Sequence, residues 1–249
     1  MSTTSITTLT AVLAFLGWIL QIGILLSLYR GDAFKNYKAF VYYTLFVALT
    51  TPIGFFFNYS KHPLAGFYYY YTQDAISIVL ALIVQREIVQ KIFEHYEGIR
   101  GFGMKLFYAA IVGLILVGFG ASFSFQEHNV HADAKIIFPM ELAVRFIQVG
   151  LVLFLMFFMR TLALVWKREY FAIALGFGQY ATASIIAYGL KIHFGVKLPQ
   201  SYLIVIPVFY FVAQSIWAAA ILFPVRVPAA GELPDFSHLE KWNKMLTRV

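Results

Sequence analysis

The sequence predicts an all-α, polytopic membrane protein with seven transmembrane helices, and three observations support this fold class. Apolar residues make up 61% of the 249 positions, and charged residues make up only 12%. A soluble domain carries about 25% charged residues, so this chain lacks the polar surface that a soluble protein of its length needs. The third observation is that the apolar residues gather into long stretches separated by short polar connections.

Seven of these stretches are candidates for transmembrane helices, because a helix needs about 20 mostly apolar residues to cross the hydrocarbon core. They are residues 9–29, 39–57, 67–84, 106–125, 137–159, 170–190 and 202–223. The connections between them are too short to hold a soluble domain. The sequence shows no internal repeat of the kind that many transporters carry.

The third stretch is predicted to belong to a longer helix that projects from the bilayer. Its apolar part ends at Gln85, but helical periodicity continues to about Glu97. Glu87 and Lys91 lie four residues apart, in the order that favours an ion pair along one helix. We therefore expect a helical extension on the side of the membrane where this stretch ends.

The distribution of Lys and Arg predicts that the N-terminus lies outside and that the C-terminus is cytoplasmic. In this orientation 14 of the 19 basic residues lie in cytoplasmic connections, helix ends and the tail. Residues 2–8 carry no Lys or Arg and so lack the basic segment of a signal peptide, and the first helix is expected to be retained. The sequence predicts a multi-pass protein of a bacterial inner membrane, with a transmembrane domain at residues 1–225 and a cytoplasmic tail at residues 226–249.

The tail is predicted to carry a short amphipathic helix that lies on the membrane surface. Prolines follow the last apolar stretch, and Asp235 can cap a helix that begins there. Apolar and basic residues separate onto two sides of that helix, as they do in interfacial helices on anionic membranes. A solvated helix and a partner-binding helix are the alternatives.

Ionisable side chains inside the apolar stretches are the candidate functional residues, because a charge within the bilayer is costly. Asp74 lies in the third stretch, and Glu141, Arg145 and Gln148 lie along one face of the fifth. The helical rise places the charged groups in the outer third of the membrane, where they can meet in one polar pocket. These residues can form a structural clasp between the two helices or a binding site for a small ligand or ion, and they are our candidate ligand-binding residues. We predict that Arg145 faces the bundle interior and is ion-paired with the carboxylates of Glu141 and Asp74.

Other residues of the apolar stretches are expected to join helices or to mark the membrane boundary. Six polar residues of the sixth and seventh stretches are typical of hydrogen bonds between helices; they are Gln179, Thr182, Ser184, Tyr188, Gln214 and Ser215. The aromatic run at residues 67–71 is typical of an interfacial belt. Small residues in the sixth stretch predict close helix packing; they are Ala174, Gly176, Gly178 and Ala181.

The residue inventory argues against several classes of function. Without cysteine, the chain has no disulfide, thiolate metal site or iron–sulfur cluster. The six histidines lie in connections, helix extensions and the tail, where no pair can hold a haem within the bundle, so neither a metal nor a cofactor is expected. No side chains are arranged for nucleophilic or paired-carboxylate catalysis, so no enzymatic activity is expected. The net charge of +7 is scattered along the chain, which argues against nucleic-acid binding.

Two groups of residues in the third to sixth helices form a recognisable pattern. The first comprises residues 69–74, 86–88 and 92–100, and the second comprises residues 141–150 and 174–178. This pattern resembles a family of uncharacterised bacterial seven-helix integral membrane proteins with no established activity. The family usually has Glu at the position of Asp74, and several of its basic residues are replaced here, by Glu94, His95 and Glu97. The resemblance implies a seven-helix fold without implying an activity.

Three kinds of function are consistent with these observations. The first is a non-enzymatic sensor-like or accessory protein that binds a small ligand or lipid in the outer half of the membrane and contacts a cytoplasmic partner. The second is a small-solute or ion transporter, and the third is a structural subunit of a larger membrane complex. The expected partners are the lipid bilayer and either another membrane protein or further copies of this chain.

Overall fold

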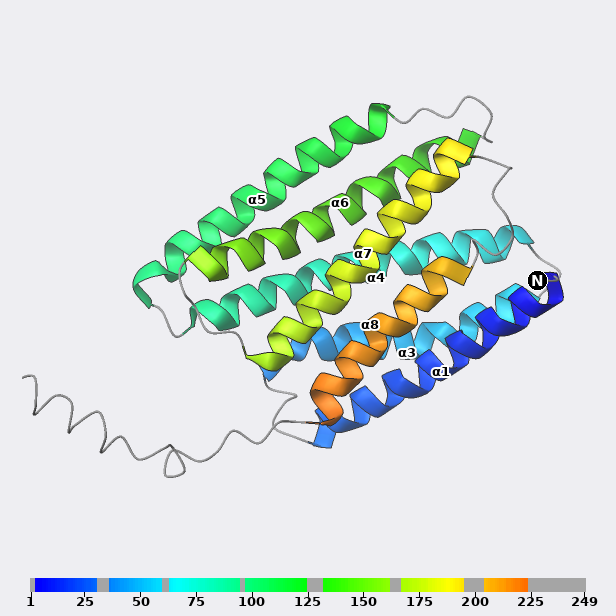
Figure 1. Ribbon diagram of the computed structural model, residues 1–249, viewed down its shortest axis with the longest axis horizontal. Helices are drawn as coiled ribbons and strands as arrows, with labels where there is room; N and C mark the ends of the chain where they lie inside the picture. The colour runs from blue at the N-terminus through cyan, green and yellow to red at the C-terminus, as the bar shows by residue number, and fades with distance from the viewer. Residues whose placement is uncertain are drawn as a thin grey trace, which may run out of the picture.

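The computed structural model describes residues 3–30, 36–59, 63–94, 97–124, 132–161, 167–194 and 204–223. Within these residues the chain is all-α and forms seven helices that alternate in direction (Figure 1). They are α1 (Thr3–Arg30), α3 (Lys38–Tyr59), α4 (Pro63–Phe93), α5 (Glu97–Ser124), α6 (Ala132–Thr161), α7 (Arg168–Phe194) and α8 (Val205–Leu222). The tail at residues 226–249, with its predicted amphipathic helix, lies outside the described residues.

Five segments of these helices are long and apolar enough to cross a membrane, which makes the chain a multi-pass membrane protein by helix length and hydropathy. They are Thr8–Arg30, Lys38–Phe57, Leu142–Thr161, Arg168–Leu190 and Val205–Leu222. In α5 the apolar part found among the described residues, Gly101–Leu116, is shorter. Each of the seven predicted stretches lies largely within one described helix, but the third and fourth stretches, in α4 and α5, are not among these five segments.

The connection between the third and fourth predicted stretches differs from the expectation. The periodicity predicts one helix continuing to about Glu97, but α4 ends at Phe93 and α5 begins at Glu97. Lys91 Nζ forms its direct ion pair with Glu94 Oε2, at 3.0 Å, rather than with Glu87 as expected, although the Lys91 charge still lowers the pKa of the Glu87 carboxyl. An apolar stripe can continue across a break between two helices that pack on the same core, so periodicity alone did not locate the break.

The helices form a closed ring in which the first and the last are neighbours. α8 packs extensively on both α1 and α7, α6 packs on α5 and α7, and α3 packs on α4. By contrast, α4 makes only sparse contacts with α5, α6 and α7. A polar contact crosses this side of α4 near its C-terminal end, where Arg86 Nε donates to Tyr108 Oη over 2.8 Å. α4 therefore meets α5, α6 and α7 along a seam of few contacts, whereas α3 closes the ring by packing on α1.

Trp217 of α8 is the centre of an aromatic cluster inside the ring. Its ring centroid lies 5.4 Å from that of Phe40, 5.8 Å from that of Tyr43 and 4.8 Å from that of Phe177. Its indole Nε1 donates to the backbone oxygen of Ile173 over 3.2 Å, so the buried polar atom of the ring is satisfied. The cluster joins α3, α7 and α8.

Glycines of α7 make this packing possible. A Cβ atom at Gly176 would overlap the indole of Trp217, and a Cβ atom at Gly178 would lie 2.9 Å from Val152 Cγ1 on α6. Close packing at the small residues of this helix was predicted and is confirmed. At Gly189 of the same helix, by contrast, no described atom lies within 4 Å of an added Cβ.

Two glutamines predicted to join helices do so. Gln214 Nε2 on α8 donates to Gln21 Oε1 on α1 over 3.0 Å, and Gln179 Nε2 on α7 donates to the backbone oxygen of Phe209 on α8 over 2.7 Å. Both bonds lie between helices that also pack extensively. The prediction of interhelical hydrogen bonds is therefore confirmed for these two residues. It is wrong for Thr182, Ser184 and Ser215, whose hydroxyl groups donate to backbone oxygens four residues earlier in their own helices.

A proline in α3 explains a further contact between helices. Pro52 has no N–H group, so it cannot donate to the carbonyl of Ala48, four residues earlier. Trp18 of α1 supplies the missing donor, because its Nε1 lies 2.9 Å from that carbonyl oxygen. The side chain of one helix thus completes the backbone hydrogen bonding of its neighbour.

At one end of the bundle, two charged side chains form hydrogen bonds with the terminal backbone groups of neighbouring helices. Glu87 of α4 accepts a 2.8 Å hydrogen bond from the N–H of Ala39 in the first turn of α3. Arg168 of α7 donates to the backbone oxygens of Phe223 and Ala219 at the end of α8, over 2.7 and 3.1 Å. Each charge opposes the dipole of the helix end that it contacts. Burial raises the pKa of the Glu87 carboxyl, whereas the N–H groups of α3 lower it.

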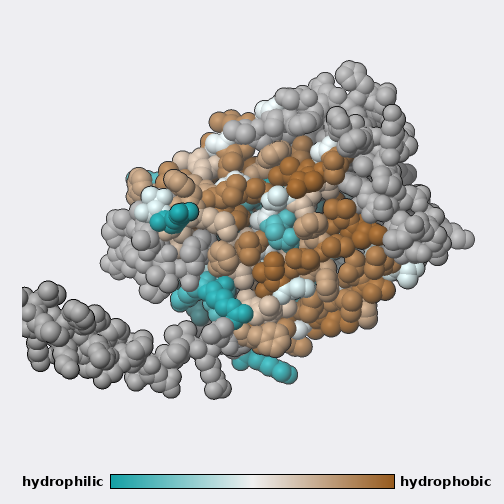
Figure 2. Space-filling view, viewed as in Figure 1, coloured by the Kyte–Doolittle hydropathy of each residue, from teal (hydrophilic) through white to brown (hydrophobic). Residues whose placement is uncertain are grey.

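The surface agrees with a membrane location. Figure 2 shows apolar residues over most of the described surface in this view, with hydrophilic residues gathered mainly where α1 ends and α7 begins. Many large apolar side chains along the helices are exposed, including Leu49, Leu116 and Phe157. Such a surface requires contact with lipid rather than with water.

Candidate functional site

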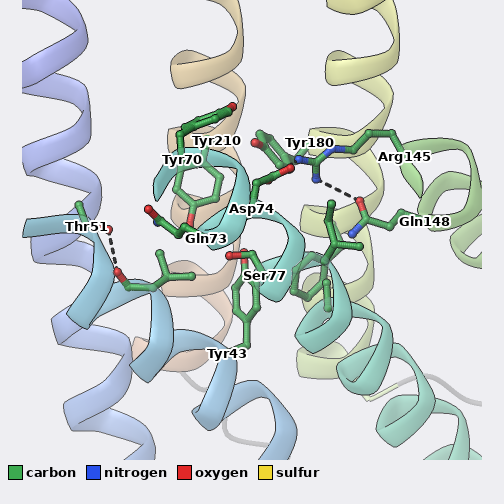
Figure 3. Close-up of a pocket in the computed structure, with 14 residues that line it drawn as sticks. Tyr43, Thr51, Tyr70, Gln73, Asp74, Ser77, Arg145, Gln148, Tyr180 and Tyr210 are labelled. Atoms are coloured by element: carbon green, nitrogen blue, oxygen red, sulfur yellow. Dashed lines mark hydrogen bonds and ion pairs between the residues drawn. The ribbon is translucent and has the colours of Figure 1, made fainter. Parts of the chain in front are cut away.

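A cavity of about 180 Å³ lies inside the ring and is lined by side chains of α3, α4, α6, α7 and α8. Its lining combines a few apolar side chains with a larger set of polar ones, which Figure 3 labels. The polar lining residues are Tyr43, Thr51, Tyr70, Gln73, Asp74, Ser77, Arg145, Gln148, Tyr180 and Tyr210. Hereafter we call this cavity the central pocket.

An ion pair between Asp74 and Arg145 spans the pocket wall. Arg145 Nη2 lies 2.8 Å from Asp74 Oδ1, and the pair joins α4 to α6 across the seam of few contacts. The Arg145 side chain is 4% exposed, and that of Asp74 is 16% exposed. The predicted pairing of Arg145, facing the bundle interior, is therefore confirmed. Asp74 is therefore the more exposed member of the pair.

Two further groups hold the guanidinium in place. Arg145 Nη1 donates to Gln148 Oε1 over 3.2 Å, one turn along α6. The Arg145 Cζ atom also lies 4.9 Å from the ring centroid of Tyr180, which is a cation–π contact. In Figure 3, Arg145 and Gln148 extend from one side of the pocket toward Asp74, and Tyr180 lies beside them. The guanidinium is thus bound on several sides within a mostly apolar bundle.

Tyrosines supply much of the remaining lining. The ring centroids of Tyr180 and Tyr210 lie 5.1 Å apart in an edge-to-face arrangement. Tyr210 also lies beside Tyr43 and beside the Gln21 and Gln214 side chains, which are hydrogen-bonded to each other. The pocket therefore adjoins the polar contact that joins α1 and α8.

Three of the four site residues that the sequence predicts lie together in the structure. The structure brings together Asp74, Arg145 and Gln148. Glu141 lies on α6 one turn before Arg145, but its side chain is outside what the structure describes. The tyrosines of the lining were not predicted. Tyr70 was assigned to the aromatic belt, although it also lines the pocket.

Gln85 is a second buried polar residue that the sequence did not single out. In the sequence Gln85 marks the polar end of the third stretch. In the structure its side chain is 0% exposed, and neither amide atom has a hydrogen-bond partner. It lies one helical turn beyond Ala81, which lines the central pocket. The buried side-chain amide of Gln85 therefore lies between the central pocket and the C-terminal end of α4.

The arrangement suits the binding of a small polar molecule. A cation and an anion face the same cavity, and aromatic rings and hydroxyl groups surround them. Among the described side chains, no group of three or more His, Asp or Glu residues is placed to hold a metal ion. Comparison of the chain with protein-family models, curated proteins and solved structures finds no match, and no family is identified.

Proposed function

We propose that this chain is a non-enzymatic integral membrane protein, sensor-like or accessory in role, that binds a small ligand or lipid in the central pocket and contacts a cytoplasmic partner. The observation that carries this proposal is the Asp74–Arg145 ion pair on the wall of a cavity inside a helical bundle. Apolar side chains in place of a buried ion pair often give equal or greater stability. A pair retained beside a polar-lined cavity therefore favours binding over a purely structural clasp.

The proposal includes seven membrane spans, with the N-terminus outside. Two features support it: α4 and α5 belong to the same ring as the five apolar helices, and successive helices alternate in direction. Basic residues are found toward one end of the bundle, in or near the last or first turns of five helices: Arg30, Lys38, Arg86, Arg160 and Arg168. Basic residues favour the cytoplasmic side. The same end includes Lys91 and Glu94 of α4, which are candidates for the partner surface.

The orientation can be tested with introduced cysteines, because the natural chain has none. We expect a membrane-impermeant thiol reagent to label Ser2→Cys in the inner membrane of spheroplasts, and to label Thr247→Cys only after the membrane is permeabilised. The unchanged chain serves as the control without a thiol. Labelling of Thr247→Cys alone in intact spheroplasts would reverse the orientation.

Ligand binding can be tested by filling the pocket. Ser77 of α4 lines the cavity, whereas Ala75, two residues away, is exposed on the outer face of the bundle. We expect some members of a library of small polar solutes and lipid headgroups to raise the unfolding temperature of the wild-type protein. A ligand at 100 times its Kd stabilises a folded protein by about 2.7 kcal/mol. Ser77→Phe should abolish this stabilisation, and Ala75→Phe should retain it.

The outcomes of this screen separate the alternatives. If no compound stabilises the wild-type protein, or if Ser77→Phe responds as the wild-type protein does, the pocket is not a ligand site. A transporter is the second candidate, because Gln85 adds a buried polar group one turn beyond the pocket. Accumulation of a stabilising ligand in vesicles that contain the protein would assign transport rather than sensing.

A further inference from the structure

We propose that the ligand of the central pocket is a small zwitterion, with an ammonium group that binds at Asp74 and an acidic group that binds at Arg145. This inference rests on the proposed function, because it names the chemical class of the ligand for the same site. Three properties of the pocket carry it: its charge, its aromatic lining and its size.

The charge of the pocket matches a molecule with one positive and one negative group. Asp74 and Arg145 both line the cavity and neutralise each other across 2.8 Å. A ligand with only one charge would interact favourably with one of these residues and unfavourably with the other, in surroundings that screen charge weakly. A zwitterion can engage both residues at once. If the ligand separates Asp74 from Arg145, its ammonium group becomes the new partner of Asp74 and its acidic group becomes the new partner of Arg145.

The exposure of the two residues indicates how the zwitterion is oriented. The side chain of Asp74 is the more exposed of the two, so the ammonium group binds at the more accessible residue and the acidic group binds at the more buried one. Arg145 remains held by Gln148 and by the ring of Tyr180. The acidic group therefore meets a positioned guanidinium, which can bind a carboxylate or a phosphate through paired N–H groups.

The aromatic lining suits an ammonium group. Tyr180 already lies against a cation, because its ring faces the Arg145 guanidinium at 4.9 Å. Tyr43, Tyr70 and Tyr210 add three more rings and hydroxyl groups to the wall. Rings gathered in this way are the usual surroundings of bound ammonium groups, including quaternary ones, and the hydroxyl groups can accept hydrogen bonds from primary ammonium groups.

The size of the cavity restricts the ligand to a small molecule. Its volume is about 180 Å³, and a cavity of about 150 Å³ in another protein holds benzene. A short amino acid or a small betaine fits this space, whereas a complete lipid or a long peptide does not. A lipid is therefore limited to placing its headgroup in the pocket.

Two sets of matched compounds test the inference with the full-length wild-type protein in detergent. The first set is L-alanine with isopropylammonium, which lacks the carboxylate, and isobutyrate, which lacks the ammonium. The second set is glycine betaine with choline, which lacks the carboxylate, and tert-butylacetate, which lacks the ammonium. We expect at least one zwitterion to bind at least tenfold more tightly than both of its analogues in titration calorimetry. Binding should be lost in Ser77→Phe and retained in Ala75→Phe.

Two variants add a readout that a structural role of the ion pair would not produce. Asp74→Asn should shift the preference toward the anionic analogue, and Arg145→Gln should shift it toward the cationic analogue. If neither variant folds, the wild-type measurements still decide the question. An analogue that binds within threefold of its zwitterion would overturn the assigned class. If the library yields a pocket ligand but both zwitterions fail to bind, this inference falls while the proposed function stands; if no pocket ligand is found, both fall.

Discussion

Asp74→Asn is expected to lower the free energy of unfolding by about 3–5 kcal/mol, because it leaves the buried Arg145 guanidinium without its carboxylate partner. Arg145→Gln should cost less, since it leaves the carboxylate of Asp74 in the more exposed position, beside a polar cavity. The exposed Arg160, on the same helix as Arg145, provides the control: Arg160→Ala should change stability by less than about 0.5 kcal/mol.

A double-mutant cycle in detergent measures the coupling between the two residues. The variant that carries both substitutions should be more stable than the sum of the single effects implies, because it buries two neutral amides in place of one unpaired charge. The measurement is the free energy of unfolding of the four proteins. Effects that add to within about 0.3–0.5 kcal/mol would show that the two residues are independent.

The second large effect is expected at Gly176, where even a single added methyl group would contact an aromatic ring. Gly176→Ala should lower the free energy of unfolding by about 1–3 kcal/mol, because its Cβ atom overlaps the indole of Trp217. Trp217 is 1% exposed and is enclosed by neighbouring rings, so it has little room to move away.

The matched control is the same substitution at Gly189, on the same helix. No described atom lies within 4 Å of a Cβ added there. Gly189→Ala should therefore be neutral or stabilising by about 0.5–1 kcal/mol, because alanine is a better helix former than glycine. Thermal unfolding of both variants checks the comparison. Equal destabilisation by the two substitutions would mean that contact with Trp217 does not limit the packing of α7.

The charged residues of the pocket could be predicted from the sequence because the cost of a charge within an apolar stretch depends only on that stretch. A charge within an apolar stretch is costly wherever the helix faces, so Asp74 and Arg145 could be recognised from composition alone. Their similar depth then followed from the rise of a helix. These two rules were enough to predict that Arg145 is ion-paired, with Asp74 as one of its two expected partners, and the structure contains the Asp74 pair.

The tyrosines of the pocket could not be predicted in the same way. Tyr43, Tyr180 and Tyr210 lie on three helices, and aromatic residues are equally at home against lipid, at the interface or in the core. Only the rotation of each helix in the ring determines which rings face the cavity, and hydropathy does not specify that rotation. Gln85 was missed for a related reason, because a glutamine at the end of an apolar stretch usually reaches water.

The neighbouring positions of α1 and α8 constrain how the protein is made. α1 is synthesised first, but its most extensive contacts are with α8, which is synthesised last. The Gln21 and Gln214 side chains that meet across this interface are separated by 193 positions. At roughly 5–20 residues per second, ribosomes need roughly 10–40 s to make the intervening chain. During that interval the membrane insertion machinery or lipid must cover the face of α1 that α8 later occupies, so the ring closes only after synthesis of the last helix.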